Sequence, residues 1–288
     1  MHPFSYVAAT SVDEVNSALA EHGKRARPLA GGTDLLVQLR AGRFELDAVV
    51  DIKGVPEANV VSLNGNFTVG SAVSLAEVYE NPEIRSAYPG LIDAAELIGG
   101  IQIQSRATLA GNLCNATPSG DSLCPMIVHD GVVHIASSAG NRTVPVADFC
   151  TGPGTTMLTA SEWVTQISFP PPPANFGAAY ERFIPRNEMD IAVAGAASAL
   201  TLDDDGNIAE AKIALAAVAP VPLLIAEAGA VLIGKPPTAE SFEAAGNIAY
   251  DSVSPITDMR GTIAQRRHLS GVLTRRTLEK AAARAKAG

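Results

Sequence analysis

The chain is poor in cysteine. Cys114, Cys124 and Cys150 are its three cysteines among 288 residues, and no two of them form a C-x-x-C pair. Disulfide frameworks need an even number of cysteines, and zinc or iron–sulfur sites need several at close spacing. The sequence therefore predicts neither a disulfide-bonded fold nor a metal site within this chain.

Basic residues and long apolar runs are also scarce. The 21 Lys and Arg residues are outnumbered by 30 Asp and Glu residues, which gives a formal net charge of −9. A nucleic-acid binder needs a basic face, and a membrane-spanning helix needs about 20 consecutive apolar residues. The N-terminal stretch has no basic segment followed by an apolar one, so no signal peptide is expected. We therefore predict a cytoplasmic protein with no nucleic-acid partner and no membrane span.

The apolar residues that are present alternate between helical and strand patterns. The first fifty residues are predicted to form a helix, a strand, a glycine-rich turn, a helix and a strand. Hairpins at residues 60–71 and 132–146 flank helices that begin at Ser74 and Pro89, and a strand is predicted at 162–169. Helical and strand patterns are thus mixed throughout this part of the chain.

Four consecutive prolines, Pro170 to Pro173, interrupt this pattern. They can continue neither a helix nor a β-ladder, so they predict a stiff connector and the main domain boundary. Beyond it, strands are expected at 178–183, 191–202 and 208–219. Helices are expected within 222–233, 238–249 and 261–287, which makes a second α+β unit.

Two turns of small residues are the candidate binding features. The first reads L-A-G-G-T-D from Leu29 to Asp34, and the second, read as a strand end at Thr108, continues to Asp121. Glycine permits close backbone approach, and hydroxyl, amide and bare N–H groups can donate to phosphate oxygens without any lysine. Either turn alone is better explained as an ordinary tight turn. Together they predict a clamp around one diphosphate.

A dinucleotide-binding Rossmann unit is an alternative for the first turn. Asp51 ends a predicted strand 20 positions after Gly31, where an acidic residue would meet a ribose hydroxyl. The fingerprint G-x-G-x-x-G nevertheless fails, because Thr33 and Leu36 stand at its second and third glycine positions. A stand-alone NAD-dependent dehydrogenase therefore remains the second choice. A non-catalytic assembly subunit with empty turns is the third.

Four segments, in this order along the chain, read "LAGGTDLL", "RATLAGNLCNATPSGDSLCP", "GAAYERFIPRNEMDIAVA" and "DMRGTIAQRRHLSGVLTRRTL". Together they resemble the flavoprotein, or medium, subunit of the molybdenum hydroxylases, the family of carbon-monoxide dehydrogenase and xanthine dehydrogenase. The first two resemble its FAD-binding motifs, and the last two resemble the opening and closing segments of its C-terminal domain. The resemblance implies an FAD-binding fold of the vanillyl-alcohol-oxidase (PCMH) type in two subdomains, residues 1–56 and 57–173. A smaller C-terminal α+β domain would cover residues 177–286.

The resemblance also implies which residues hold FAD. The expected set is Leu29, Ala30, Gly31, Gly32, Thr33, Asp34, Thr108, Gly111, Asn112, Cys114, Asn115, Gly120, Asp121, Val164 and Arg182. Val164 would lie beside the isoalloxazine, and Arg182 would stand where the family usually has a lysine near the flavin ring. Two further departures are Ala110, where the motif has glycine, and Ser105, where it has asparagine.

The function implied is electron transfer, with no catalytic residue in this chain. FAD, attached noncovalently, would pass electrons from iron–sulfur clusters to an external acceptor. Molybdopterin and [2Fe–2S] clusters are expected in a large and a small partner subunit, as a dimer of heterotrimers. The large subunit would select the substrate. The single tryptophan, Trp163, is expected to be core, and the basic residues of the last helix are expected to face solvent.

Overall fold

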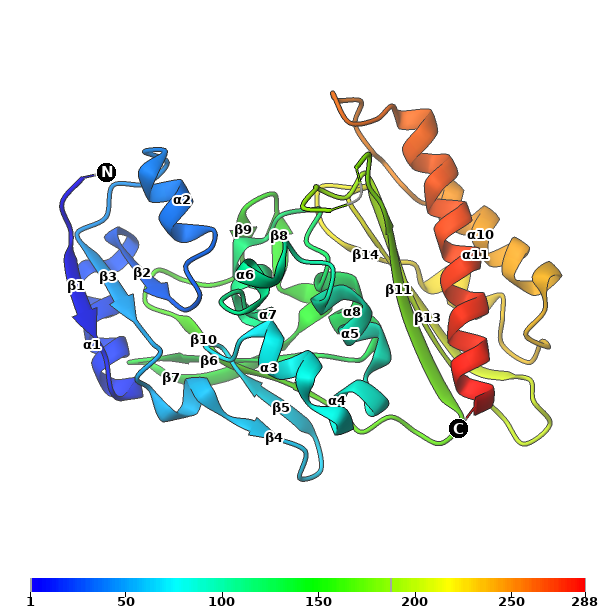
Figure 1. Ribbon diagram of the computed structural model, residues 1–288, viewed down its shortest axis with the longest axis horizontal. Coiled ribbons are helices and arrows are strands. Elements are labelled where there is room, and N and C mark those ends of the chain that lie inside the picture. The colour runs from blue at the N-terminus through cyan, green and yellow to red at the C-terminus, as the bar shows by residue number, and fades with distance from the viewer. Residues whose placement is uncertain (1, 187, 288) are drawn as a thin grey trace.

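The computed structural model describes residues 2–186 and 188–287. Within these residues the chain runs through three larger sheets in sequence order, from the blue N-terminal end to the red C-terminal helix in Figure 1. Helices pack on each sheet, which confirms the predicted α+β class. The domain limits 1–56, 57–173 and 177–286 stay predictions.

The first sheet is parallel and has the order β1-β3-β2. Its elements are β1 (Ser5–Ala8), α1 (Val12–His22), β2 (Ala26–Leu29), α2 (Leu35–Arg40) and β3 (Ala48–Asp51). Ser11 caps α1 by accepting the N–H of Glu14 at 3.3 Å. Strand β1 is missing from the sequence-based prediction, because its mostly exposed residues show no apolar alternation.

The second sheet is antiparallel and has the order β4-β5-β10-β6-β7. Its strands are β4 (Val61–Ser62), β5 (Phe67–Gly70), β6 (Val132–Ser137), β7 (Gly140–Pro145) and β10 (Trp163–Phe169). Short helices lie between β5 and β6, namely α3 (Leu75–Glu80), α4 (Pro82–Ala87), α5 (Pro89–Ala95), α6 (Ile101–Gln104), α7 (Leu109–Asn115) and α8 (Leu123–Val128). Short 3-10 turns lie at Gly23–Arg25, Pro56–Asn59 and Val146–Asp148, and a small ribbon joins β8 (Cys150–Gly152) to β9 (Thr155–Thr156).

The third sheet is antiparallel and lies between two layers of helices. Its strands are β11 (Phe176–Phe183), β12 (Ala194–Leu202), β13 (Ile208–Ala216) and β14 (Leu223–Leu224). Helix α11 (Ile263–Ala287) covers one face, with α9 (Ala226–Ala230) and α10 (Ala239–Asp251) beside it (Figure 1). Helices α5 and α8, which belong to the middle unit formed by the second sheet and its helices, cover the other face. Strand β12, A-G-A-A-S-A-L-T-L, is therefore almost wholly buried, which its small residues on both faces permit.

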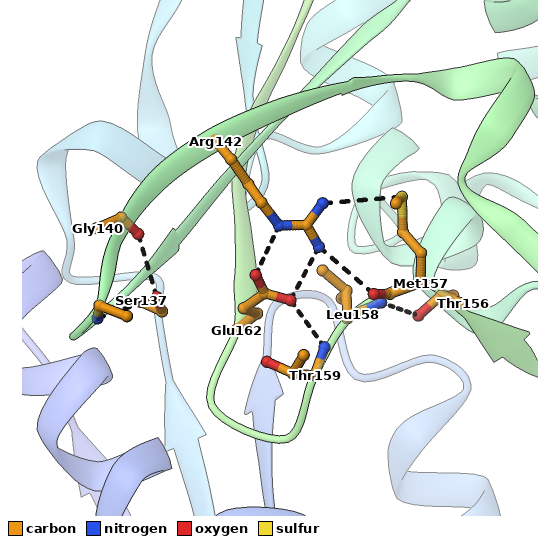
Figure 2. A network of polar contacts seen from close by, with 9 residues as sticks. Ser137, Gly140, Arg142, Thr156, Met157, Leu158, Thr159 and Glu162 are labelled. Carbon is orange, nitrogen blue, oxygen red and sulfur yellow. Dashed lines mark hydrogen bonds and ion pairs between the residues drawn. The ribbon is translucent and has the colours of Figure 1, made fainter.

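An ion-pair network holds the loop that leads into β10 (Figure 2). The Arg142 guanidinium on β7 donates to both carboxylate oxygens of Glu162, at 2.6 and 2.9 Å, and to the Met157 carbonyl at 3.4 Å. The Thr159 N–H donates to the same carboxylate at 2.8 Å. Arg142 lowers the pKa of Glu162 to about 2. The network fixes where β10 starts.

Charged residues of the last helix are largely engaged within the chain. Arg284 donates to both oxygens of Asp93 on α5, at 2.6 and 2.8 Å. Arg266 is 4% exposed and pairs with Asp258 at 2.8 Å. The expectation of a solvated basic face is wrong for these two residues, because α11 packs over the sheet with both guanidiniums facing protein.

Residues 105–125 also differ from their sequence-based description. Thr108 does not end a strand: it caps helix α7, with its hydroxyl accepting the Gly111 N–H at 2.8 Å. Helix α8 begins at Leu123. A seven-residue helix rich in small side chains shows too little periodicity to be predicted.

Candidate functional site

The first turn connects β2 to α2 and presents free backbone donors. Gly32 has a φ of +76°, a conformation that favours glycine. Within the described part of the chain, no hydrogen-bond acceptor is found for the N–H groups of Gly31, Gly32, Thr33 and Asp34. Four successive free N–H groups suit an anion with several oxygens. The Leu29 side chain packs beneath the turn: an added Cβ at Gly32 would lie 2.9 Å from Leu29 Cδ1, and Leu29 belongs to a small core with Leu39.

The second turn meets the first directly. A Cβ added to Gly31 would fall 1.8 Å from the carbonyl oxygen of Arg106. The Gln38 side-chain amide on α2 donates to Asn115 Oδ1 at 2.9 Å, although 77 positions separate the two residues. The two segments therefore lie against each other, and a side chain at position 31 would keep them apart.

Small residues shape the second turn from within. Ser122 donates to the Asn112 side-chain oxygen at 2.7 Å, and Gly120 lies so close that an added Cβ would be 3.1 Å from the same oxygen. The Asn115 side-chain amide donates to Thr117 at 2.8 Å. The side-chain N–H groups of Asn112 stay available, since among the described residues only the oxygen of that side-chain amide is hydrogen-bonded. Ala110 is 3% exposed and packs in the core, so its extra methyl group faces protein.

A cavity of about 200 Å³ opens where the first turn meets the middle unit. Its polar lining comes from Gly31, Lys53, Asn59, Ser74, Glu77, Ser105 and Arg106. Lys53 donates to the Ala30 carbonyl at 3.4 Å and places a positive charge beside the turn. Cavities that enclose drug-sized ligands measure about 300–1,000 Å³, so this one could take only part of a dinucleotide. The remainder would lie along the open turns.

Asp121 is engaged inside the protein. Its carboxylate, in a residue 7% exposed, accepts from the Tyr180 hydroxyl at 2.6 Å and from the Arg182 guanidinium. Arg182 also donates to the Leu97 carbonyl at 2.8 Å. Burial raises the pKa of Asp121, and the charge of Arg182 opposes that shift. The structure thus brings two expected site residues together, as an ion pair joining the second turn to β11.

Two further expected residues lie at the surface. Asp34 and Cys114 are exposed, yet desolvation raises the pKa of the Asp34 carboxyl and raises the pKa of the Cys114 thiol to about 12. Val164 is 4% exposed in β10, the strand on which α7 packs. Trp163 next to it is core, as expected, and its indole N–H donates to Asn16 at 3.0 Å.

Asp51, the acid of the Rossmann alternative, is already bound by its neighbours. Its carboxylate accepts from the Tyr6 hydroxyl and from Lys53 Nζ, the latter at 2.6 Å. Desolvation raises the pKa of the Asp51 carboxyl, but the hydrogen bonds from Lys53 and Tyr6 lower it by more. The net pKa is therefore below its usual value. An already satisfied carboxylate is a poor partner for a ribose hydroxyl.

The residues that sequence reasoning missed are those that join distant segments. They are Gln38, Lys53, Arg106 and the hydroxyl contact of Tyr180. No local pattern marks them, because each acts on a segment far away in the chain. In the part of the chain that the structure describes, no three His, Cys, Asp or Glu side chains gather as metal ligands would. The arrangement supports binding of a phosphate-containing cofactor across two meeting turns.

Comparison with known proteins identifies the family. Residues 2–172 match the family described as the FAD-binding domain in molybdopterin dehydrogenase. The chain belongs to this family. Residues 178–281 match the family described as the CO dehydrogenase flavoprotein C-terminal domain. The resemblance seen in the motifs is therefore confirmed, and it extends to both parts of the chain.

Relatives of the family match over almost their full length. The chain is 33% identical to the xanthine dehydrogenase FAD-binding subunit of Escherichia coli O157:H7, over 96% of this chain and 95% of that one. It is 30% identical to the carbon monoxide dehydrogenase medium chain of Hydrogenophaga pseudoflava, over 98% of each chain. A solved chain of quinoline 2-oxidoreductase from Pseudomonas putida 86 superposes with a TM-score of 0.92, at 29% identity, covering 99% of this chain and 98% of that one. These matches confirm the predicted flavoprotein fold and give no support to a stand-alone Rossmann dehydrogenase.

Proposed function

We propose that this chain carries FAD as the electron-transfer subunit of a molybdenum hydroxylase complex. One observation carries the proposal: Gly31 of the first turn lies against Arg106, which leads into the second turn 75 positions later, beside four backbone N–H groups that find no acceptor among the described residues. Such a site fits a diphosphate, because it offers neutral donors to several oxygens at once. Because the matched family is an FAD-binding domain, the diphosphate is best identified as the pyrophosphate of FAD.

Both turns would contribute hydrogen-bond donors to the FAD phosphates. The N–H groups from Gly31 to Asp34 and the Thr33 hydroxyl would donate to phosphate oxygens. Asn112 would add its side-chain amide from the second turn. The remaining members of the proposed site are Leu29, Ala30, Thr108, Gly111, Cys114, Asn115, Gly120, Asp121, Val164 and Arg182. The structure places Leu29 and Val164 in packed positions, where they would shape the site through the backbone and neighbouring side chains.

FAD, when bound, supplies the chemistry by taking up electrons from a partner's iron–sulfur clusters and releasing them to an external acceptor. This chain's residues bind and orient it. The cation of Arg182 stays paired with Asp121, so the pair adds little net charge to its surroundings. A Cys114 thiol with a pKa of about 12 is a poor nucleophile, which favours noncovalent attachment.

The proposal includes the setting of the subunit. Its partners would be a large molybdopterin subunit and a small [2Fe–2S] subunit, in a dimer of heterotrimers in the cytoplasm. The substrate would be selected by the large subunit. Among the described helices, none combines the length and apolar composition needed to cross a membrane. We also propose that the units end as predicted, at 1–56, 57–173 and 177–286.

The test is an FAD titration of the full chain, alone and with its partner subunits, followed by flavin fluorescence and absorbance. We expect saturable uptake of one FAD per chain and complete release on denaturation. A parallel titration with NAD should show no binding. Absence of FAD uptake even with the partner subunits present would overturn the proposal. Flavin that stayed attached after denaturation would overturn its noncovalent part.

A further inference from the structure

Tyr180 connects the C-terminal sheet to the second turn. Its side chain, 1% exposed on β11, donates from the hydroxyl to Asp121 Oδ1 at 2.6 Å. Its backbone N–H donates to Asp93 Oδ2 at 3.0 Å, so the residue is held at both ends. Such a tyrosine has little freedom to move its hydroxyl away from the carboxylate.

Gly195 on β12 provides the space for that hydroxyl. A Cβ added at this position would lie 2.6 Å from Tyr180 Oη and 3.3 Å from the nearest ring carbons. Gly195 is paired with Arg182 across the β11–β12 ladder and has no positive φ, so backbone conformation does not call for glycine here. Close approach of the Tyr180 hydroxyl is the physical reason for its small size.

The position of Asp121 is coupled to that of the Asn112 side chain through the two residues that flank Asp121 in the chain. Gly120 precedes it and lies against the Asn112 side chain, and Ser122 follows it and donates to that same side chain at 2.7 Å. A buried carboxylate that loses a donor is left partly unsatisfied and tends to shift or rotate. Movement of Asp121 would therefore displace Asn112, a proposed FAD contact.

We propose that Tyr180 is a positioning residue: by holding the Asp121 carboxylate, with Gly195 leaving room for its hydroxyl, it sets the geometry of the second turn and the affinity for FAD. The inference rests on the proposed function, since it concerns the same site. It adds Tyr180 to Arg182 as a residue through which the C-terminal domain acts on the FAD site, although the expected phosphate donors lie in the other two units.

The test uses the full chain and three variants, Tyr180→Phe, Gly195→Ala and the double variant, each titrated with FAD. Removing the hydroxyl should raise the Kd for FAD about tenfold, the change expected when the displaced Asn112 side chain no longer donates to a phosphate oxygen. Gly195→Ala should raise it to a similar extent by pushing the hydroxyl aside. The double variant should bind no more weakly than Tyr180→Phe, because the methyl group then meets the ring carbons at 3.3 Å rather than the oxygen at 2.6 Å.

Tyr88→Phe is the matched control. It also removes a buried hydroxyl near the domain junction, one that donates to the Pro170 carbonyl at 3.0 Å, but it leaves the turns untouched. It should lower the thermal midpoint of the FAD-free chain without changing the Kd. Wild-type affinity in Tyr180→Phe, or additive losses in the double variant, would overturn the inference alone. A wild-type chain that takes up no FAD would overturn the proposed function and this inference together.

Discussion

Replacing Gly31 by alanine tests whether contact between the two turns forms the binding site. The added Cβ would lie 1.8 Å from the Arg106 carbonyl oxygen, against an ordinary contact distance of 3.4 Å, so the segments must separate by roughly 1.6 Å. A donor that moves this far no longer makes a hydrogen bond. Losing two such bonds to phosphate, at about 1.5 kcal/mol each, corresponds to about a 100-fold rise in the Kd for FAD.

The assay is an FAD titration of the full chain, with thermal unfolding of the FAD-free chain recorded alongside. Gly42→Ala is the control, because its Cβ would meet nothing within 4 Å. Its φ of +72° makes alanine cost about 1 kcal/mol of stability, but the turns stay in contact. We expect the control to keep its affinity for FAD. A folded Gly31→Ala protein that bound FAD within about threefold of wild type would refute the reasoning.

Three further predictions concern single residues. Gln38→Ala removes the 2.9 Å bond to Asn115 and should weaken FAD binding about fivefold, as measured by titration; an unchanged Kd would show that the bond does not hold the turns together. Burial lowers the pKa of His129 to about 3, so the unfolded chain gains a proton below about pH 6.5 while the folded one stays neutral, and stability falls with falling pH. Urea unfolding should show that the free energy of unfolding falls by about 2 kcal/mol less in His129→Phe than in wild type between pH 6.5 and 5. An equal fall in both proteins would show that His129 is not the source of the pH dependence. Arg142→Gln should cost about 1 kcal/mol at pH 7, because solvent partly screens the pair, and this difference should fade as pH falls from about 4.5 to about 2 and Glu162 is protonated; a constant difference would refute the assignment.

Local signals in the sequence were sufficient for most of the elements. The capping box at Ser74 forms as its pattern predicts, with Glu77 reaching back to the cap. The turn at Asn64-Gly65 joins β4 to β5, and Gly65 takes the positive φ of 82° that such a hairpin needs. These features depend on residues a few positions apart, so one stretch of sequence contains all the information they require.

The same signals failed where a segment is short or pairs with a distant one. Strand β1 exists because β3, more than forty residues later, offers it a parallel partner. Helix α7 replaces the predicted strand end and turn, since seven residues make only about two helical turns and show too little of the helical period. In both cases packing against the rest of the chain outweighs a weak local preference.

The sequence alone determined that two turns can bind an anion through neutral donors, and its motifs were enough to indicate the family. Tertiary structure alone decided that the turns touch, through Gly31 and Arg106, and that Asp121 pairs with Arg182 and Tyr180, the latter 59 positions away. The reason is physical. A residue's conformational freedom and hydrogen-bonding groups are properties of its type, whereas which groups meet depends on how separate units pack, and packing is settled by the shape of the whole core.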